Sequence, residues 1–199
     1  TTPEGTMVAI WGKNQEINRM RIHKENCTGL VIDVQTRLFP HMYRHQTLLQ
    51  RCLILIEGLK ILQVPLMITE QYPRGLGPTV EPVLQAMNGI TPIQKSAFSC
   101  CDEPVFSAEV AGTTRKTWII CGIEAHVCVL QTAMDLVSLH HQPVVVADAI
   151  SSRNPSDKQV ALERMRQEGA IITTTESILF ELSRISGTEA FKAISNLVK

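Results

Sequence analysis

Short apolar runs that favour β-strands alternate with longer segments of helical periodicity along most of this chain. The strand-like runs are expected at residues 29–34, 64–69, 117–121, 143–147 and 170–174, and the helices at residues 46–62, 127–140, 156–167 and 177–184. The strand-like runs are apolar at successive positions, which is typical of parallel strands covered by helices on both faces. The pattern therefore predicts an α/β fold in which a doubly wound, mostly parallel sheet lies between two helical layers, a three-layer α/β/α architecture.

The length of the chain favours one domain. A chain of 199 residues, 44% of them hydrophobic, can bury about 70% of the surface of its unfolded state. No internal repeat or Pro/Ser-rich linker divides the sequence, so residues 28–199 are predicted to form a single domain. Residues 1–27 are polar and mixed in charge, and we interpret them as an N-terminal arm. A mitochondrial presequence is the alternative for this segment, but its glutamates argue against one.

Charge and cysteine content narrow the functional classes. Lys plus Arg and Asp plus Glu number 19 each, so no basic field attracts nucleic acid, and we expect a small, weakly charged partner. The six cysteines include no C-x-x-C motif and no zinc-finger spacing, which favours free thiols in a reducing, cytoplasmic environment. The apolar stretches are far shorter than the roughly 20 residues that cross a bilayer, so no membrane association is expected.

Residues 70–99 interrupt the alternation. Seven proline and glycine residues fall in this segment, which we interpret as a long loop excursion. Long loops in compact domains often carry function.

Three polar residues stand where an open α/β sheet binds its ligands, beyond the carboxyl ends of the strands. Asp33 follows the first apolar run, Lys95 lies where the excursion returns, and Cys128 falls in the first turn of the helix after residues 117–121. Each has an ordinary alternative, because aspartates form turns, single lysines are usually solvated, and free cysteines are often buried as small hydrophobes.

Taken together, the three residues fit nucleophilic catalysis. A thiolate attacks better than a thiol, and its pKa falls at a helix N-terminus and beside a lysine. Asp33 would accept the proton of the Cys128 thiol and return it to a leaving group, while Lys95 stabilises the anions. Such a triad would transfer an acyl group through a thioester.

Four segments stand in the order and spacing of one known superfamily. They read LVIDVQ at residues 30–35, KSAFS at 95–99, CGIEAHVC at 121–128 and VADAISSR at 146–153. Together they resemble the isochorismatase-like cysteine hydrolases, which include nicotinamidases and N-carbamoylsarcosine amidase. The stretch TEQYPRGLGPT at residues 69–79 resembles the branch called isochorismatase domain-containing proteins.

The resemblance implies a Rossmann-like, six-stranded sheet in the order 3-2-1-4-5-6 and a catalytic triad of Asp33, Lys95 and Cys128. It also implies a cis peptide bond between Ile123 and Glu124, which turns the amides of Glu124 and Cys128 toward a developing oxyanion. A homo-oligomer, a dimer or larger, is expected from the same resemblance.

Two departures from the superfamily narrow the chemistry. The metal-binding Asp-x-His motif of nicotinamidases is absent, since residues 69–73 read TEQYP, so we expect no metal and no other cofactor. True isochorismatases cleave a vinyl ether and can lack the cysteine, so the presence of Cys128 favours amide or imide substrates. Gln35, Tyr72 and Arg153 are candidate substrate-binding residues. His126 is two positions from Cys128 and does not face it on a helix.

The sequence therefore predicts a metal-independent cysteine hydrolase acting on a small amide-like molecule. The alternative is a catalytically idle domain that keeps the fold for protein partners. A dinucleotide-binding domain is disfavoured, because no G-x-G-x-x-G follows the first strand.

Overall fold

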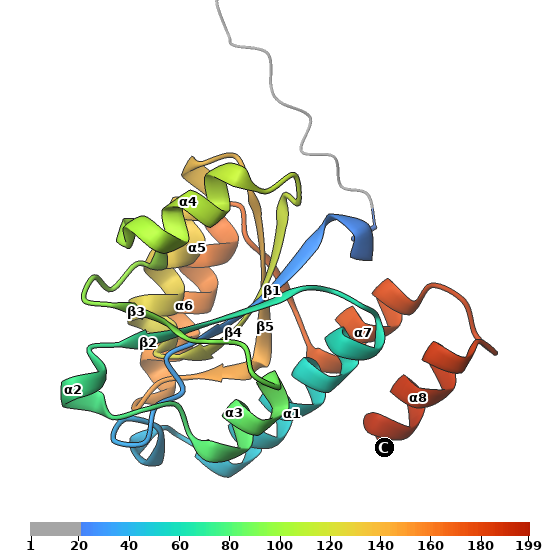
Figure 1. Cartoon of the computed structure of the whole chain (residues 1–199), viewed down its shortest axis with the longest axis horizontal. Helices are drawn as coiled ribbons and strands as arrows, with labels where there is room; N and C mark the ends of the chain where they lie inside the picture. Colours follow the sequence, from blue (N-terminus) through green and yellow to red (C-terminus); the bar gives the residue numbers. More distant parts are fainter. Residues whose placement is uncertain (1–20) are drawn as a thin grey trace, which may run out of the picture.

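A parallel sheet between two helical layers forms the core of the protein in a computed structural model that describes residues 21–199 (Figure 1). The strands are β1 (Cys27–Ile32), β2 (Leu66–Gln71), β3 (Ile93–Lys95), β4 (Thr117–Ile123), β5 (Gln142–Ser151) and β6 (Ile171–Thr173). All neighbouring pairs are parallel, and the order is β3-β2-β1-β4-β5-β6. The predicted fold class and strand order are confirmed.

Eight α-helices cover the sheet within the described residues. They are α1 (His45–Ile61), α2 (Pro73–Leu76), α3 (Glu81–Met87), α4 (Pro104–Gly112), α5 (Leu130–Ser138), α6 (Pro155–Gln167), α7 (Thr175–Ser183) and α8 (Glu189–Leu197). Helices α1, α3, α7 and α8 lie on one face of the sheet, and α4, α5 and α6 on the other (Figure 1). Over residues 21–199, no helix has both the length and the apolar character that a membrane crossing requires.

Side chains of the central strand β1 contribute to two separate hydrophobic clusters, one on each face of the sheet. All six of its residues are buried, and their side chains alternate between the faces of the sheet. Val31 packs in the cluster with α1 and α7, whereas Leu30 and Ile32 pack in the cluster with α4, α5 and α6. A strand that is buried at every position and mostly apolar is therefore placed at the centre of the sheet, where both faces need apolar side chains.

Several elements differ from the sequence-based expectations. The excursion over residues 70–99 is not a long loop, because it contains α2, α3 and the edge strand β3. Helix α4 was not expected, and the helix expected at residues 177–184 is not the last one, since α8 follows it. The predicted arm at residues 1–27 lies outside the described residues up to position 20, and its end forms a 3-10 turn (Lys24–Asn26) and the first residue of β1.

Gly122 allows β4 to pass close to β1. Its φ angle is +122°, and a Cβ atom at this position would collide with the backbone of Ile32, its partner in β1. Gly89 also has a positive φ, +85°, but a Cβ atom there would meet no atom within 4 Å. The two glycines therefore share a conformational demand but differ in the space around them.

Gly122→Ala is expected to lower the free energy of unfolding by about 2–6 kcal/mol, the sum of backbone strain and overpacking. Gly89→Ala, the matched control, is expected to cost only about 1–2 kcal/mol, because it adds conformational strain without a collision. Urea denaturation of both variants measures the difference. Equal decreases in the free energy of unfolding of the two variants would show that the close approach of Gly122 to Ile32 does not add to the destabilisation.

Candidate active site

Asp33, Lys95 and Cys128 lie at the carboxyl edge of the sheet. Asp33 follows the last residue of β1, Lys95 is the last residue of β3, and Cys128 belongs to the π-helical turn Ala125–Val129 between β4 and α5. The side chains of Asp33 and Lys95 are fully buried, and their Oδ2 and Nζ atoms are 2.7 Å apart. Cys128 is only 6% exposed. The structure thus forms a buried ion pair from two of the residues and places the thiol at the same edge.

Asp33 is held by the neighbouring strand β2. Its φ angle of +53° turns the chain at the end of β1, and its amide donates to the carbonyl of Thr69 at 3.2 Å. The hydroxyl of Thr69 donates to Asp33 Oδ1 at 2.7 Å, which leaves Oδ2 for the Lys95 ammonium. Thr69 is fully buried and therefore fixes the carboxylate plane.

The Lys95 ammonium is surrounded by oxygen acceptors. Besides Asp33 Oδ2, its Nζ atom lies 2.8 Å from Gln71 Oε1, 3.2 Å from the carbonyl of Ala97 and 3.1 Å from that of Phe98. Burial alone would lower the pKa of Lys95, but the Asp33 carboxylate and the nearby thiols outweigh burial, so the pKa is raised. Four acceptors for three N–H bonds leave no free donor for a substrate, and Lys95 acts as a fixed positive charge.

The Cys128 thiol rests in its protonated form. Its Sγ atom donates to Gln71 Oε1 at 3.9 Å. Burial raises the pKa of Cys128 most, the Asp33 carboxylate raises it further, and the Lys95 ammonium opposes both only in part. The sequence-based expectation of a lowered thiol pKa is therefore wrong for the resting protein. The error comes from burial, which a helix N-terminus and one lysine do not overcome.

Glu124 and Arg153 form an ion pair beside this turn. The peptide bond between Ile123 and Glu124 is cis. The Glu124 carboxylate accepts hydrogen bonds from the amide and the Nε atom of Arg153, each at 3.2 Å. The Arg153 side chain is 63% exposed. His126 lies away from the thiol, because its Nδ1 atom contacts Ser152 Oγ at 2.8 Å and its Nε2 atom lies 3.9 Å from Asp157.

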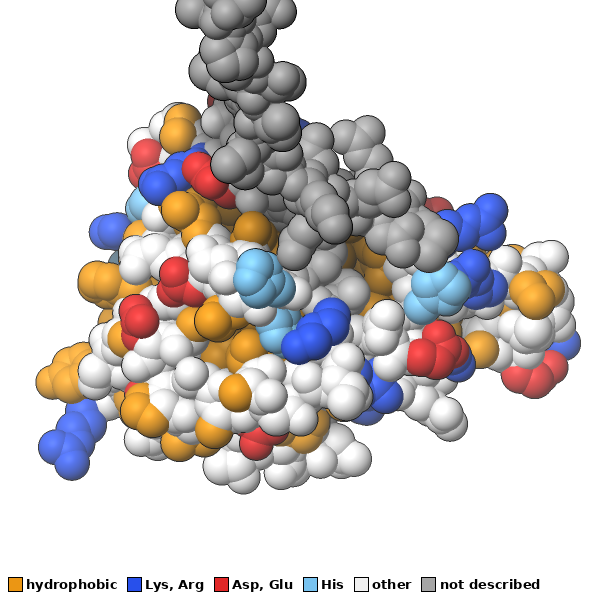
Figure 2. Space-filling model, turned by 90° about the horizontal axis from the view of Figure 1, so that it is seen from above, with side chains coloured by type: hydrophobic (Ala, Val, Ile, Leu, Met, Phe, Trp, Pro, Cys, Tyr) orange, Lys and Arg blue, Asp and Glu red, His pale blue; other side chains and the backbone are white. Residues whose placement is uncertain are grey.

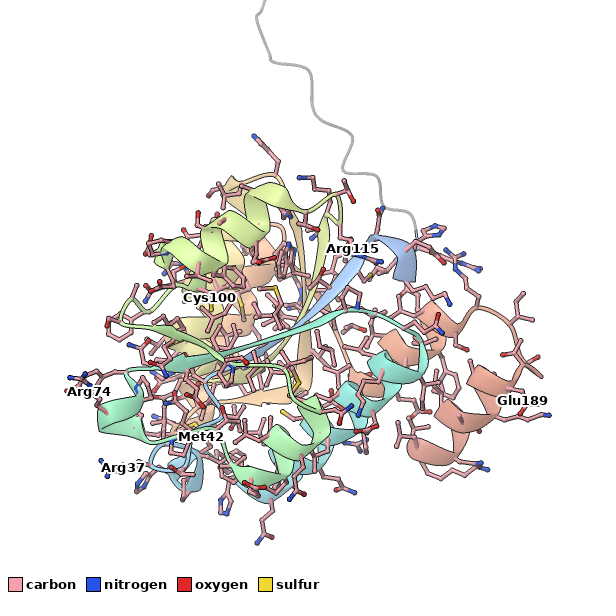
Figure 3. The ribbon with its side chains drawn as sticks, viewed as in Figure 1. Arg37, Met42, Arg74, Cys100, Arg115 and Glu189 are labelled. Carbon is pink, nitrogen blue, oxygen red and sulfur yellow. The ribbon has the colours of Figure 1, made fainter. Side chains whose placement is uncertain are left out.

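The other two predicted substrate-binding residues lie in different environments. Gln35 is fully buried: its Nε2 donates to the carbonyls of Gln71 and Gly77, and its Oε1 accepts from the amide of Gln71. Gln35 thus supports the backbone at the end of β2. Tyr72 is 56% exposed, and its ring covers Gly75 in the short helix α2. Arg74 projects outward near α2 (Figure 3).

Three residues at the site were missed by sequence reasoning. Thr69 and Gln71, in β2, contact Asp33, Lys95 and Cys128 as described above. Cys100, which is labelled in Figure 3, is fully buried, and its Sγ atom lies 3.9 Å from Thr69 Oγ1. The pairing of Gln71 with Lys95 in the β2–β3 register would have identified Gln71, but β3 itself was not expected.

Glu70, the penultimate residue of β2, has a structural role in this protein. The carboxylate of Glu70 accepts hydrogen bonds from the amide and the hydroxyl of Thr79, at 2.7 and 2.8 Å. Within residues 21–199, no group of three His, Cys, Asp or Glu side chains is arranged to hold a metal ion. Two surface cavities of about 590 and 210 Å³ are lined by other residues, including Arg115 and Lys158 respectively.

Removing one partner of the buried ion pair should destabilise the protein strongly. Lys95→Met and Asp33→Asn should each lower the free energy of unfolding by about 3–5 kcal/mol, because each leaves one charge buried without its partner. The double variant should lose less than the sum of the two. Lys192→Met, which breaks the exposed pair with Glu189, should change stability by less than about 1 kcal/mol. Urea denaturation provides the values, and additive losses in the double variant would contradict the coupling.

Comparison with known proteins places the chain in a family. A profile of the isochorismatase domain matches residues 28–177. Isochorismatase family protein 1B of Dictyostelium discoideum is 37% identical over 183 residues, covering 90% of this chain and 89% of the relative. A Caenorhabditis elegans structure described as MAR1 ribonuclease is 36% identical, with a TM-score of 0.83 over 90% of this chain and 92% of that one.

A further solved structure shares the fold at lower identity. The YcaC gene product of Escherichia coli, described as an octameric hydrolase of unknown specificity, is 23% identical, with a TM-score of 0.83 over 89% of this chain and 90% of that one. The domain match and the relatives, which align over most of their lengths, confirm the resemblance inferred from the four sequence segments: the chain belongs to the isochorismatase domain family.

Proposed function

We propose that this protein is a metal-independent cysteine hydrolase that cleaves the C–N bond of a small amide or imide through a thioester on Cys128. The observation that carries the proposal is the buried ion pair of Asp33 and Lys95 at the sheet edge that also holds the Cys128 thiol. Burying two charges is costly, and a fold that only needed stability would be served as well by apolar residues. A nucleophile that must lose and regain a proton does need a fixed carboxylate.

The first half of the reaction makes the acyl-enzyme. Asp33 accepts the thiol proton as Sγ of Cys128 bonds to the substrate carbonyl carbon, and the carbonyl oxygen becomes an oxyanion. We assign the backbone amides of Glu124 and Cys128 to that oxyanion, as the family resemblance implies. The C–N bond then breaks, and the proton on Asp33 passes to the leaving nitrogen. In this scheme the thiolate exists only while substrate is bound, which agrees with the raised pKa of the resting thiol.

The second half restores the enzyme. Asp33 takes a proton from water as the water oxygen attacks the thioester carbonyl, and the C–S bond breaks. The proton returns from Asp33 to Cys128, and the acid product leaves. Lys95 has no free N–H bond, so its role is to hold the Asp33 carboxylate in place and to stabilise the transient thiolate by charge.

The surroundings of the site favour a small substrate. Asp33, Lys95 and Cys128 are each at most 6% exposed, so a polymer has no direct access to them. The exposed guanidinium of Arg153 and the Tyr72 ring are the groups we assign to substrate binding at the rim. We also propose a homo-oligomer, since the Escherichia coli relative in fold is described as octameric.

RNA is a useful comparison substrate, because the Caenorhabditis elegans neighbour is described as a ribonuclease. Two features argue against RNA as the substrate here. Lys plus Arg and Asp plus Glu are equal in number, and charged side chains of both signs are interspersed on the face in Figure 2. On the part of that face formed by residues 21–199 that is visible in Figure 2, a polyanion therefore finds no extended basic surface.

A screen of small primary amides, with ammonia release as the readout, tests the proposal, and imides are screened in parallel with the acid product as the readout. Cys128→Ala should reduce the rate with any accepted substrate on the order of 10³-fold or more, because it removes the nucleophile. Cys101→Ala, which changes a partly buried thiol outside the ion-pair network, serves as the control. Intact-protein mass spectrometry of the wild type should show an acyl adduct that maps to Cys128.

Three results separate the competing functions. Ammonia release that survives in Cys128→Ala would refute the cysteine mechanism. RNA cleavage that is lost in Cys128→Ala, without amide hydrolysis in the wild type, would favour a nuclease. An absence of both activities and of any adduct would favour the idle domain that keeps the fold for protein partners.

A further inference from the structure

The side-chain amide of Gln71 joins the thiol to the ammonium. Its Oε1 atom lies 2.8 Å from Lys95 Nζ and 3.9 Å from Cys128 Sγ, and its Nε2 donates to the carbonyl of Ser96 at 2.7 Å. The orientation of the amide follows from its partners, because an ammonium has no acceptor and a carbonyl has no donor. A flipped amide would place NH2 against Lys95 and oxygen against oxygen at Ser96. The oxygen of Gln71 must therefore face the nucleophile.

The fold holds this amide firmly in place. Gln71 is 9% exposed and ends β2, where it pairs with Lys95 of β3. The side chain of Gln35 binds both backbone polar groups of Gln71. Its Oε1 accepts a hydrogen bond from the Gln71 backbone amide at 2.8 Å, and its Nε2 donates one to the Gln71 backbone carbonyl at 2.9 Å. One buried glutamine thus positions the other, and the position of Gln71 Oε1 is set before any substrate arrives.

Gln71 acts on the Cys128 thiol in a different way from the charged groups around it. The titratable groups that act on the thiol are Asp33 from the end of β1, Lys95 from β3 and Cys100 from the 3-10 turn before α4. On α6, which packs against the turn of Cys128, Asp157 faces His126 instead. Asp33 and Lys95 act on the thiol with opposite signs. A hydrogen bond accepted by a neutral oxygen favours the thiol over the thiolate.

We propose that Gln71 is a positioning residue for the reaction: its oxygen holds the thiol hydrogen of Cys128 and one hydrogen of Lys95 together, so that the nucleophile rests protonated with a fixed S–H direction. This inference rests on the proposed function of Cys128. When substrate is attacked, the S–H bond turns from Gln71 to Asp33 and the proton passes to the carboxylate. Gln71 keeps its hydrogen bond to Lys95, while Sγ bonds to the carbonyl carbon and the carbonyl oxygen becomes the oxyanion.

Two substitutions at Gln71 should shift the thiol in opposite directions. Gln71→Met removes the acceptor that favours the thiol form, so it should favour the thiolate. Gln71→Glu keeps the acceptor but adds a negative charge, so it should disfavour the thiolate. Below the pKa, the rate of alkylation by iodoacetamide is proportional to the thiolate fraction. At one fixed, mildly alkaline pH we therefore expect Cys128 to react about tenfold faster in Gln71→Met and about tenfold slower in Gln71→Glu.

The experiment uses the full chain, with peptide mass spectrometry to follow Cys128 separately from the other five cysteines. Gln142→Met is the matched control: this partly buried glutamine also donates to backbone carbonyls, those of Pro143 and Gly169, but at the start of β5 on the opposite edge of the sheet. It should leave the Cys128 rate unchanged. The slope of log rate against pH should stay near one in all variants.

The outcomes are distinct. Faster alkylation in both Gln71 variants would mean that the residue only packs the site, and unchanged rates would mean that it does not act on the thiol; either result overturns the inference. If Gln71→Met fails to fold, a slower rate in Gln71→Glu supports the inference and any other rate in that variant overturns it. The proposed function fails separately, through ammonia release that persists in Cys128→Ala.

Discussion

The buried ion pair between Asp33 and Lys95 is the interaction on which the architecture of the site depends. Two opposite charges in an apolar interior are tolerated only when their remaining hydrogen-bonding capacity is satisfied. The fold meets this demand with the Thr69 hydroxyl on one side and with Gln71 and two backbone carbonyls on the other. These partners come from β2 and from the segment after β3. The order of strands β3, β2 and β1 is therefore what makes the pair possible.

The surroundings of this ion pair also explain why the pKa of the Cys128 thiol is raised. Burial raises the pKa of Cys128 most, and Asp33 raises it more than Lys95 lowers it, so the protonated thiol is favoured. A thiol in this state is expected to react slowly with oxidants and alkylating reagents, since both reactions proceed through the thiolate.

The sequence predicted those parts of the structure that depend on long apolar patterns. Strands β1, β4 and β5 each contain an uninterrupted apolar run, and the family motifs fall at or near their carboxyl ends. Strand β3 was missed because three residues, Ile-Gln-Lys, carry no pattern of their own and are ordered by pairing with β2. Gln71 was missed for the same reason, since its role depends on a neighbour 24 positions away. The sign of the thiol pKa shift depends on burial depth, which local sequence does not encode.

Gly122 sets the distance between the backbones of β4 and β1 next to the site, because any side chain at this position would collide with Ile32. It stands beside Ile32, one residue before Asp33, and one residue before the peptide bond that leads into the turn of Cys128. The missing Cβ atom thus sets the spacing between the strand that precedes Asp33 and the strand that leads into the turn of Cys128. Because this close approach lies directly before both residues, the packing of β1 against β4 sets the separation between the Asp33 carboxylate and the Cys128 sulfur.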